Sequence, residues 1–320
     1  MELEAGDQTA ERPPPRGRCM AWLSSELHYT ALACCYQDNK AFAFSPWLPL
    51  KWKWQWAYLL YRWIIMLYFV GWLLYSLVNA AQTPDVQAKF FIYLTNWGFV
   101  CFNVYLFMAA ISVTVTLYSH LHVGPPLDTL PPLTVRGGIT CTLLTTVNGL
   151  HWATAIIGLE FPVAITVLFW IFFGNGDPDQ TLSISSIHVH LLNGIIAFLD
   201  TWITGVPFRV LHVVYIILFG CVYIVFSALY YAGGGTDPAN RPYIYPVLDY
   251  GGNPGLAAGV AVGCGLVFPV ILHLIFYAMY LARYWLSTLV QTHWRVSRVS
   301  SSASGEEQAL TMQQERTIVI

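Results

Sequence analysis

Charged residues are scarce in this sequence. Of its 320 residues, 10% are charged and 56% are hydrophobic, and the mean hydropathy is +0.54. An ordinary soluble domain has about 25% charged residues. The shortage of charge excludes such a domain, and several apolar runs long enough to cross a bilayer indicate a membrane protein.

Other absences exclude whole classes of function. The formal net charge is -2, so the chain lacks the basic face that neutralises phosphates, and we expect no nucleic-acid partner. The cysteines form no CxxC pair and several lie in or beside apolar runs, which argues against a disulfide framework. The N-terminal residues lack the charged start, apolar core and cleavage site of a signal peptide. Cys19, Cys34 and Cys35 suit reversible palmitoylation, although unpaired thiols are the simpler interpretation.

Six apolar segments predict an all-α bundle of transmembrane helices. They are residues 57–80, 89–117, 147–173, 185–205, 210–232 and 256–283. A further apolar stretch, 139–147, is too short and too rich in threonine to be a span, and leads into the third. We therefore expect an N-terminal segment with little regular structure, a transmembrane domain and a disordered tail. Their ranges are 1–50, 51–284 and 285–320.

Basic residues predict the orientation of the bundle. Lys89 and Arg241 belong to the odd-numbered loops and Arg62 lies in the first span, whereas the other basic residues belong to the termini and the even-numbered loops. Because basic residues favour the cytoplasmic side, we expect both termini in the cytoplasm. The expected membrane is the plasma membrane or the endoplasmic reticulum.

The fourth span carries polar residues that hydrocarbon disfavours. At about 100° per residue, His190, Asn193 and Asp200 fall within about one third of the helix circumference, whereas His188 points the other way. Ionisable groups are rare in membrane spans and tend to face a bundle interior or a wet cavity. We therefore expect this polar stripe to face partner helices.

One residue of the second span, Thr95, is expected at the same membrane depth as His190 in this stripe. Under the predicted topology, Thr95 and His190 each lie roughly 8 to 9 Å below the non-cytoplasmic surface. A hydroxyl beside an imidazole suits nucleophilic acyl transfer, in which the histidine takes the proton as the threonine attacks a carbonyl. An amide of Asn96 or Asn103 can donate to the resulting oxyanion. Asp200 lies about 15 Å farther along the axis, too far to orient His190 directly.

Other interpretations of these residues stay open. Threonine, asparagine and histidine in membrane helices often only hydrogen-bond to a neighbouring helix, each contributing about 1 kcal/mol. The histidines show no HxxxH or HExxH spacing, so we predict neither a metal nor a cofactor. Glu160, alone in the third span, is expected to be protonated or paired with Asp200. Pro162 is expected to kink that span, which can open a cavity.

The segment between the fifth and sixth spans is dense in turn-forming residues but also rich in tyrosine. Tyr243, Tyr245 and Tyr250 lie in it, and their rings are expected at the mouth of the bundle.

Three stretches carry a resemblance to a known family. They are FFIYLTNWGF at 90–99, the HxxN stretch at 190–193 that leads to Asp200, and GGGTDPANRPYIYPVLDY at 233–250. On these residues the chain resembles the rolling stone family of multi-pass membrane proteins, whose namesake is linked to myoblast fusion. The resemblance runs through nearly all of residues 57–283.

A more distant resemblance concerns the chemistry. FPVAITVLFWIFF at 161–173, His190, Tyr223 and YPVL at 245–248 are similar to the androgen-induced protein family. Members of that family are integral-membrane hydrolases of fatty acid esters of hydroxy fatty acids, and they use a threonine nucleophile and a histidine.

Carried over residue by residue, this resemblance implies that Thr95 is the nucleophile and His190 the histidine. It also implies six spans with both ends in the cytoplasm. The chain departs from the androgen-induced family at Glu160, where that family is apolar, and at Asp200, where it more often has glutamate. The loop between the last two spans is also longer here.

Two functions from different classes follow. The first is a membrane protein of rolling stone type that cleaves a lipid ester, with membrane lipids as its surroundings. Its catalytic residues are Thr95 and His190, and the supporting polar residues are Asn96, Asn103, Asn193 and Asp200. The second is a non-enzymatic membrane protein in cell contact or fusion, in which these residues only pack helices. The sequence indicates no particular protein partner.

Overall fold

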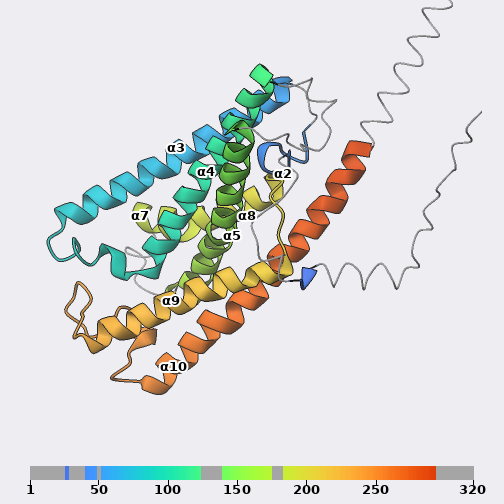
Figure 1. Ribbon diagram of the computed structural model, residues 1–320. Helices are drawn as coiled ribbons and strands as arrows, with labels where there is room; N and C mark the ends of the chain where they lie inside the picture. The colour runs from blue at the N-terminus through green and yellow to red at the C-terminus, as the bar shows by residue number, and fades with distance from the viewer. Residues whose placement is uncertain (1–25, 29–39, 49–51, 124–138, 175–182, 293–320) are drawn as a thin grey trace, which may run out of the picture.

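The computed structural model describes residues 26–28, 40–48, 52–123, 139–174 and 183–292, and within these ranges all regular structure is helical (Figure 1). The elements are α2 (Lys40–Ala43), α3 (Trp52–Gln82), η2 (Phe90–Ile92), α4 (Leu94–Val123), α5 (Ile139–Phe173), α7 (Ile184–Ile187), η3 (His188–Leu192), α8 (Asn193–Ile203), η4 (Val210–His212), α9 (Val213–Ala232), η5 (Pro246–Leu248), α10 (Pro254–Val262) and η6 (Gly263–Val267). A helix over residues 268–292 follows η6 directly.

In the described part of the chain, 6 helical stretches are long and apolar enough to cross a bilayer. They are Trp54–Gln82, Leu94–Tyr118, Thr146–Phe173, Ile184–Ile203, Val210–Ala232 and Pro254–Thr292. A helix satisfies its own backbone N–H and C=O groups, which hydrocarbon does not, so apolar runs of this length fold as helices. The predicted all-α bundle of six spans is confirmed, while the cytoplasmic placement of both termini stays a prediction.

The last span is longer than predicted. Its helix continues to Thr292, so residues 285–292, expected in the disordered tail, are helical. At the start of the third span, α5 already begins at Ile139, so the threonine-rich stretch leading into that span is part of the helix. The remainder of the tail lies outside the described residues. So do the cysteines considered for palmitoylation: Cys19, Cys34 and Cys35.

Helix α5 occupies the centre of the bundle. It packs against α4 and α8 and also contacts α9, while α3 packs on α4 (Figure 1). Gly158 permits the close approach of α4 and α5, because a Cβ at this position would overlap the side chain of Tyr105. The helix runs through Pro162 without ending. Residues after this proline line the cavity described below.

The fourth span is interrupted by a π-helical turn. In η3 the backbone N–H of Asn193 donates to the carbonyl of His188, one residue farther back than in an α-helix. After this turn, α8 buries Asn193, Asp200 and Thr201, so the polar stripe faces the protein interior. A second π-helical turn, η6, interrupts the last span. Such turns are frequent at functional sites.

The chain between α8 and η4 is mostly buried although it is not helical. We call residues 204–209 the connecting segment. Buried backbone carbonyl groups need hydrogen-bond donors, and here side chains of other helices supply them. The bonds are Trp152 Nε1 to the Pro207 carbonyl (2.6 Å), His273 Nε2 to the Arg209 carbonyl (2.9 Å) and Arg283 Nη2 to the Val206 carbonyl (2.6 Å).

Candidate active site

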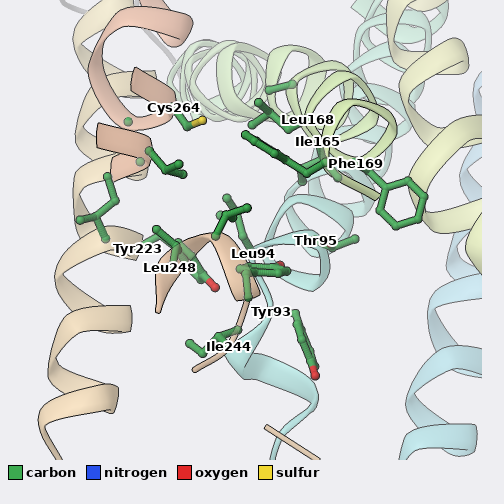
Figure 2. A pocket seen from close by; sticks show the side chains of 18 of the residues that line it. Tyr93, Leu94, Thr95, Ile165, Leu168, Phe169, Tyr223, Ile244, Leu248 and Cys264 are labelled. Carbon is green, nitrogen blue, oxygen red and sulfur yellow. The ribbon is translucent and has the colours of Figure 1, made fainter. Parts of the chain in front are cut away.

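A cavity of about 570 Å³ lies where the first turn of α4, the end of α5 and α9 meet η6 and the loop 233–253. Figure 2 shows Leu94, Tyr223 and Leu248 gathered at one end and Leu168 and Phe169 across from them. The walls are mostly aliphatic and aromatic. This volume and lining are typical of sites that hold an apolar ligand.

Thr95 lies in the first turn of α4 and lines the cavity. Its side chain is 9% exposed, and its hydroxyl is in hydrogen-bonding contact with the hydroxyl of Tyr245. The first N–H groups of a helix have no intrahelical acceptor. Here the N–H groups of Leu94 and Thr95 face the oxygen of Tyr245. The predicted nucleophile therefore lies among several hydrogen-bond donors.

His190 lines the same cavity from η3. Its ring stacks on Phe169, with a centroid separation of 3.8 Å and an interplanar angle of 7°. Among the described residues, its buried Nδ1 has no hydrogen-bond partner. The imidazole is therefore held in place by an aromatic ring and keeps a nitrogen free.

The structure brings Thr95 and His190 into one cavity but does not join them. Both are described residues, and no hydrogen bond is found between the threonine hydroxyl and the imidazole. Catalytic hydrogen bonds are often long or absent before a substrate is bound. The catalytic roles of the two residues stay predictions, with a shared cavity as their structural setting.

The three predicted supporting asparagines differ in position. Asn96 lines the cavity, and its Nδ2 donates to the Phe90 carbonyl at 2.6 Å. Asn103 is buried away from the cavity and donates to the Phe99 carbonyl, within its own helix, at 2.8 Å. The Oδ1 of Asn193 accepts the N–H of the next residue at 2.7 Å. Only Asn96 of these three lies where an amide can reach a ligand in the cavity.

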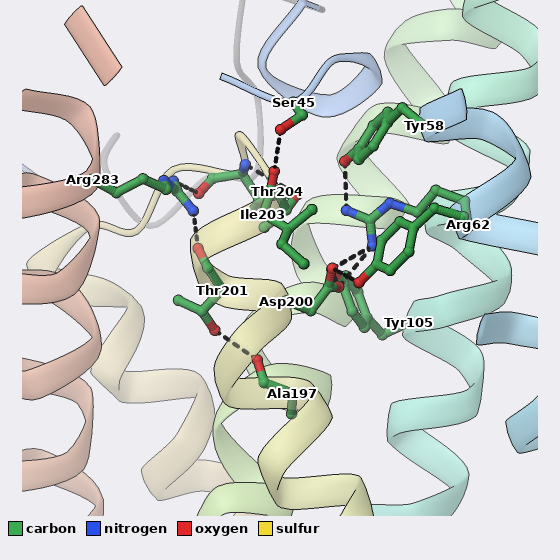
Figure 3. A network of polar contacts seen from close by, with 12 residues as sticks. Ser45, Tyr58, Arg62, Tyr105, Ala197, Asp200, Thr201, Ile203, Thr204 and Arg283 are labelled. Carbon is green, nitrogen blue, oxygen red and sulfur yellow. Dashed lines mark hydrogen bonds and ion pairs between the residues drawn. The ribbon is translucent and has the colours of Figure 1, made fainter. Parts of the chain in front are cut away.

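Asp200, the remaining supporting residue, belongs to a separate polar network (Figure 3). Its carboxylate accepts hydrogen bonds from Arg62 Nη1 at 2.7 and 2.9 Å, from Tyr61 at 2.9 Å and from Tyr105 at 2.5 Å. Arg62 Nη2 donates in turn to the Tyr58 hydroxyl at 2.6 Å. The side chains of Arg62 and Asp200 are 1% and 0% exposed. This network is an internal ion pair that joins α3, α4 and α8.

Glu160 pairs with His273, so the expected pairing with Asp200 is wrong. His273 Nδ1 lies 2.8 Å from Glu160 Oε1, and both side chains are fully buried. Because the Arg209 carbonyl can only accept, His273 Nε2 carries a hydrogen, and one proton lies between Nδ1 and the carboxyl group. The physical reason for the correction is that Asp200 already has a cationic partner in Arg62.

Arg62 and His273 were not predicted from the sequence as the partners of Asp200 and Glu160. An ionisable side chain inside a membrane span is itself a signal that a buried partner exists. Arg62 interrupts the first apolar run and His273 the last, so both could have been matched with the acidic residues of spans three and four.

The loop 233–253 forms one wall of the cavity through Ile244, Tyr245 and Leu248. A polar cluster fixes its first half. Lys89 Nζ donates to the Asp237 carbonyl at 2.7 Å, and Arg241 Nε donates to Asp237 Oδ2 at 2.7 Å. The loop is therefore an ordered part of the site.

Electrostatics in this cluster favour the charged forms of both partners. Burial raises the pKa of the Asp237 carboxyl, but the hydrogen bonds from Arg241 and the backbone N–H of Ala239 outweigh it and hold the pKa below its usual value. The same hydrogen bond to Asp237 raises the pKa of Arg241.

Comparisons with known proteins place these features in context. The model of the family described as "Protein rolling stone" matches residues 18–302. The protein named "Protein rolling stone" from Drosophila melanogaster is 30% identical over 213 residues, which cover 66% of this chain and 72% of that protein. No solved structure matches the chain at a significant level.

Proposed function

The chain belongs to the rolling stone family, and within that family we propose that it is a membrane-embedded hydrolase of lipid esters whose nucleophile is Thr95 and whose general base is His190. The observation that carries the proposal is that one cavity, apolar and of about 570 Å³, is lined by both residues. A threonine hydroxyl and an imidazole with a free nitrogen are the two groups that acyl transfer requires.

The lining of the cavity indicates the class of substrate. Aliphatic and aromatic side chains such as Phe161, Ile165 and Leu272 form its walls, while the polar Thr95 and Tyr245 are also part of the lining. An acyl chain fits the apolar walls, and its ester group fits beside the hydroxyls. The helices around the cavity are candidate membrane spans, which suits a substrate drawn from membrane lipids.

The reaction follows the chemistry of a covalent acyl-enzyme. The Thr95 oxygen attacks the ester carbonyl as His190 takes its proton, and the tetrahedral intermediate collapses when the leaving alkoxide takes that proton back. Water then attacks the acyl-threonine, with His190 again acting first as base and then as acid. His190 must be neutral at the start, so activity must fall when the imidazole is protonated in acid.

A fluorophosphonate probe tests this proposal on the purified full chain. The probe should label the wild type and Thr95→Ser, and labelling should be lost in Thr95→Ala and His190→Ala. His188→Ala is the matched control, because His188 lies two residues away and stacks on Trp72 outside the cavity. Absence of labelling in correctly folded wild type would overturn the proposal.

A second candidate function is supported by the packing of the same residues. Thr95 contacts Tyr245 and His190 stacks on Phe169, so each has a structural role without catalysis. This supports a non-enzymatic membrane protein, for which we propose a role in cell contact or fusion at the plasma membrane. In the discriminating experiment, the protein is deleted from cells that fuse, and the Thr95→Ala variant is then expressed in those cells. Full rescue supports the non-enzymatic function, and unchanged fusion after deletion argues against it.

Localisation of a tagged full chain adds a separate test. The hydrolase proposal accommodates either the plasma membrane or the endoplasmic reticulum, whereas a role in cell contact requires the plasma membrane. Staining confined to the endoplasmic reticulum would therefore remove the second candidate only.

A further inference from the structure

Tyr245 reaches the cavity from outside the spans. It lies in the loop 233–253, just before the short helix η5, and its ring packs against Phe173 and Tyr93 with centroid separations of 6.1 and 5.7 Å. These contacts fix the ring between the end of α5 and the segment before α4. The loop therefore holds the Tyr245 hydroxyl at a defined position in the cavity.

Four polar groups surround that hydroxyl. They are the Thr95 hydroxyl, the backbone N–H groups of Leu94 and Thr95, and the Tyr223 hydroxyl. Backbone N–H groups only donate, so they bind the lone pairs of the Tyr245 oxygen. The Tyr223 hydroxyl donates to the Ile92 carbonyl at 2.8 Å, so its own proton is already used. In their contact the Tyr245 hydroxyl is therefore the donor and the Tyr223 oxygen the acceptor, so a carbonyl oxygen brought by a ligand has to replace Tyr223 as the acceptor of the Tyr245 proton.

The protonation state of Tyr245 determines what it can do. Burial raises the pKa of its hydroxyl, although the hydrogen bonds from Thr95 and Leu94 act in the opposite direction. The group is therefore a neutral phenol at neutral pH. A neutral phenol donates a hydrogen bond and does not act as a base.

We infer that Tyr245 is a third catalytic residue, whose hydroxyl donates a hydrogen bond to the carbonyl oxygen of the ester that Thr95 attacks. This inference rests on the proposed hydrolase function. As the bond from the Thr95 oxygen to the carbonyl carbon forms, the C=O electron pair moves to the oxygen and the Thr95 proton moves to His190. Tyr245 keeps its proton throughout and stabilises the negative charge, as oxyanion donors do. Collapse of the intermediate restores the C=O bond.

The first test measures hydrolysis of a p-nitrophenyl ester of a medium-chain fatty acid by the purified full chain in detergent. Tyr245→Phe removes only the hydroxyl, and kcat should fall by roughly 100-fold with KM changed by less than about 2-fold. Tyr243→Phe is the matched control from the same loop, because Tyr243 does not line the cavity, and it should behave as the wild type. An unchanged kcat in Tyr245→Phe would overturn the inference while leaving the hydrolase proposal intact. An inactive wild type would overturn both.

The second test separates catalysis from packing. An alkyl trifluoromethyl ketone adds to Thr95 and carries an oxyanion, whereas an ether lipid of the same chain length does not. Tyr245→Phe should weaken inhibition by the ketone at least 10-fold and leave inhibition by the ether unchanged. Equal weakening of both inhibitors would show that Tyr245 only shapes the cavity, and would overturn the inference.

Discussion

The fourth span contributes to two polar regions that differ in how their groups are satisfied. At Asp200 the carboxylate accepts hydrogen bonds from an arginine and two tyrosines inside the bundle. At His190, two to three turns earlier, the imidazole lines a cavity and stacks on Phe169, and its Nδ1 has no hydrogen-bond partner in the part of the chain that the structure describes. A buried polar group with its partners stabilises a fold, whereas one without them beside a cavity is available to a ligand. The comparison gives the Asp200 region a structural role and leaves the His190 region as the place where the proposed chemistry would occur.

The largest effect on stability is expected when one member of the ion pair between Arg62 and Asp200 is removed. Arg62→Ala leaves the Asp200 carboxylate buried without its cation, and we expect a loss of about 3 to 5 kcal/mol in the free energy of unfolding. Denaturant unfolding of the purified protein in detergent measures it. Thr95→Ala and His190→Ala should lose less than about 1 kcal/mol in the same assay.

The double variant Arg62→Met with Asp200→Leu is the control for this effect. It removes both charges and fills the space, so much of the lost stability should return. If Arg62→Ala proves no less stable than the double variant, the ion pair does not have the structural role assigned to it.

The connecting segment offers the next largest effect. Arg283→Met removes the donor to the carbonyl groups of Thr201 and Val206, and we expect a loss of roughly 1 to 3 kcal/mol. Tyr284→Phe, at an exposed neighbouring position, should be neutral in the same unfolding measurement. A loss of similar size in both variants would mean that any substitution in this part of the last helix destabilises the protein. The hydrogen bonds to the carbonyl groups would then not be the cause.

A substitution in the cavity wall should instead lower activity and leave stability nearly unchanged. Ala164→Leu adds bulk to the cavity wall, and we expect ester hydrolysis to fall about 10-fold while the free energy of unfolding changes little. Ala258→Leu, at an exposed position of α10, is the matched control and should affect neither. A large loss of stability in Ala164→Leu, with activity per folded molecule unchanged, would contradict the separation of the two regions.

The smallest effect is expected in the loop 233–253. Asp237→Asn removes the pair with Arg241, which is 54% exposed, so stability should fall by less than about 1 kcal/mol at neutral pH. The pKa of Asp237 is lowered in the folded protein, so this stabilisation is present above the carboxyl's unfolded pKa and is lost as the pH falls through the folded one.

Melting temperatures of the wild type and Asp237→Asn, measured from neutral to acidic pH, test the sign of this effect. The two curves should converge in acid, and Asp85→Asn, which removes an exposed carboxylate elsewhere, is the control at neutral pH. A difference that grows in acid would show that the carboxylate is not stabilised by the fold.

The six spans and the polar stripe could be predicted from the sequence because each depends on a local property of the chain. Apolar length predicts six helices, and the period of α8 predicts that Asp200 and Asn193 share a buried face. Depth along the membrane also brings Thr95 level with His190, and both line one cavity. These features need only one coordinate, the distance along each helix.

The partners of buried charges need the lateral order of the helices, which apolar composition does not specify. Glu160 binds His273 from the last span, and Asp200 binds Arg62 from the first. Likewise, turn-forming residues place Tyr245 at the bundle mouth but do not predict that its hydroxyl meets Thr95. The end of the last helix was also missed, because residues 285–292 are less apolar than the span they extend.

The capping of the connecting segment also constrains the order in which the chain assembles. Two of its donors, His273 and Arg283, belong to the span that is synthesised last. Until that span emerges from the ribosome, the carbonyl groups of Val206 and Arg209 have no partner from it and the spans before it cannot close around them. A nascent chain arrested after α9 should therefore stay open to proteolysis between α8 and α9, and only release of the final helix completes the bundle.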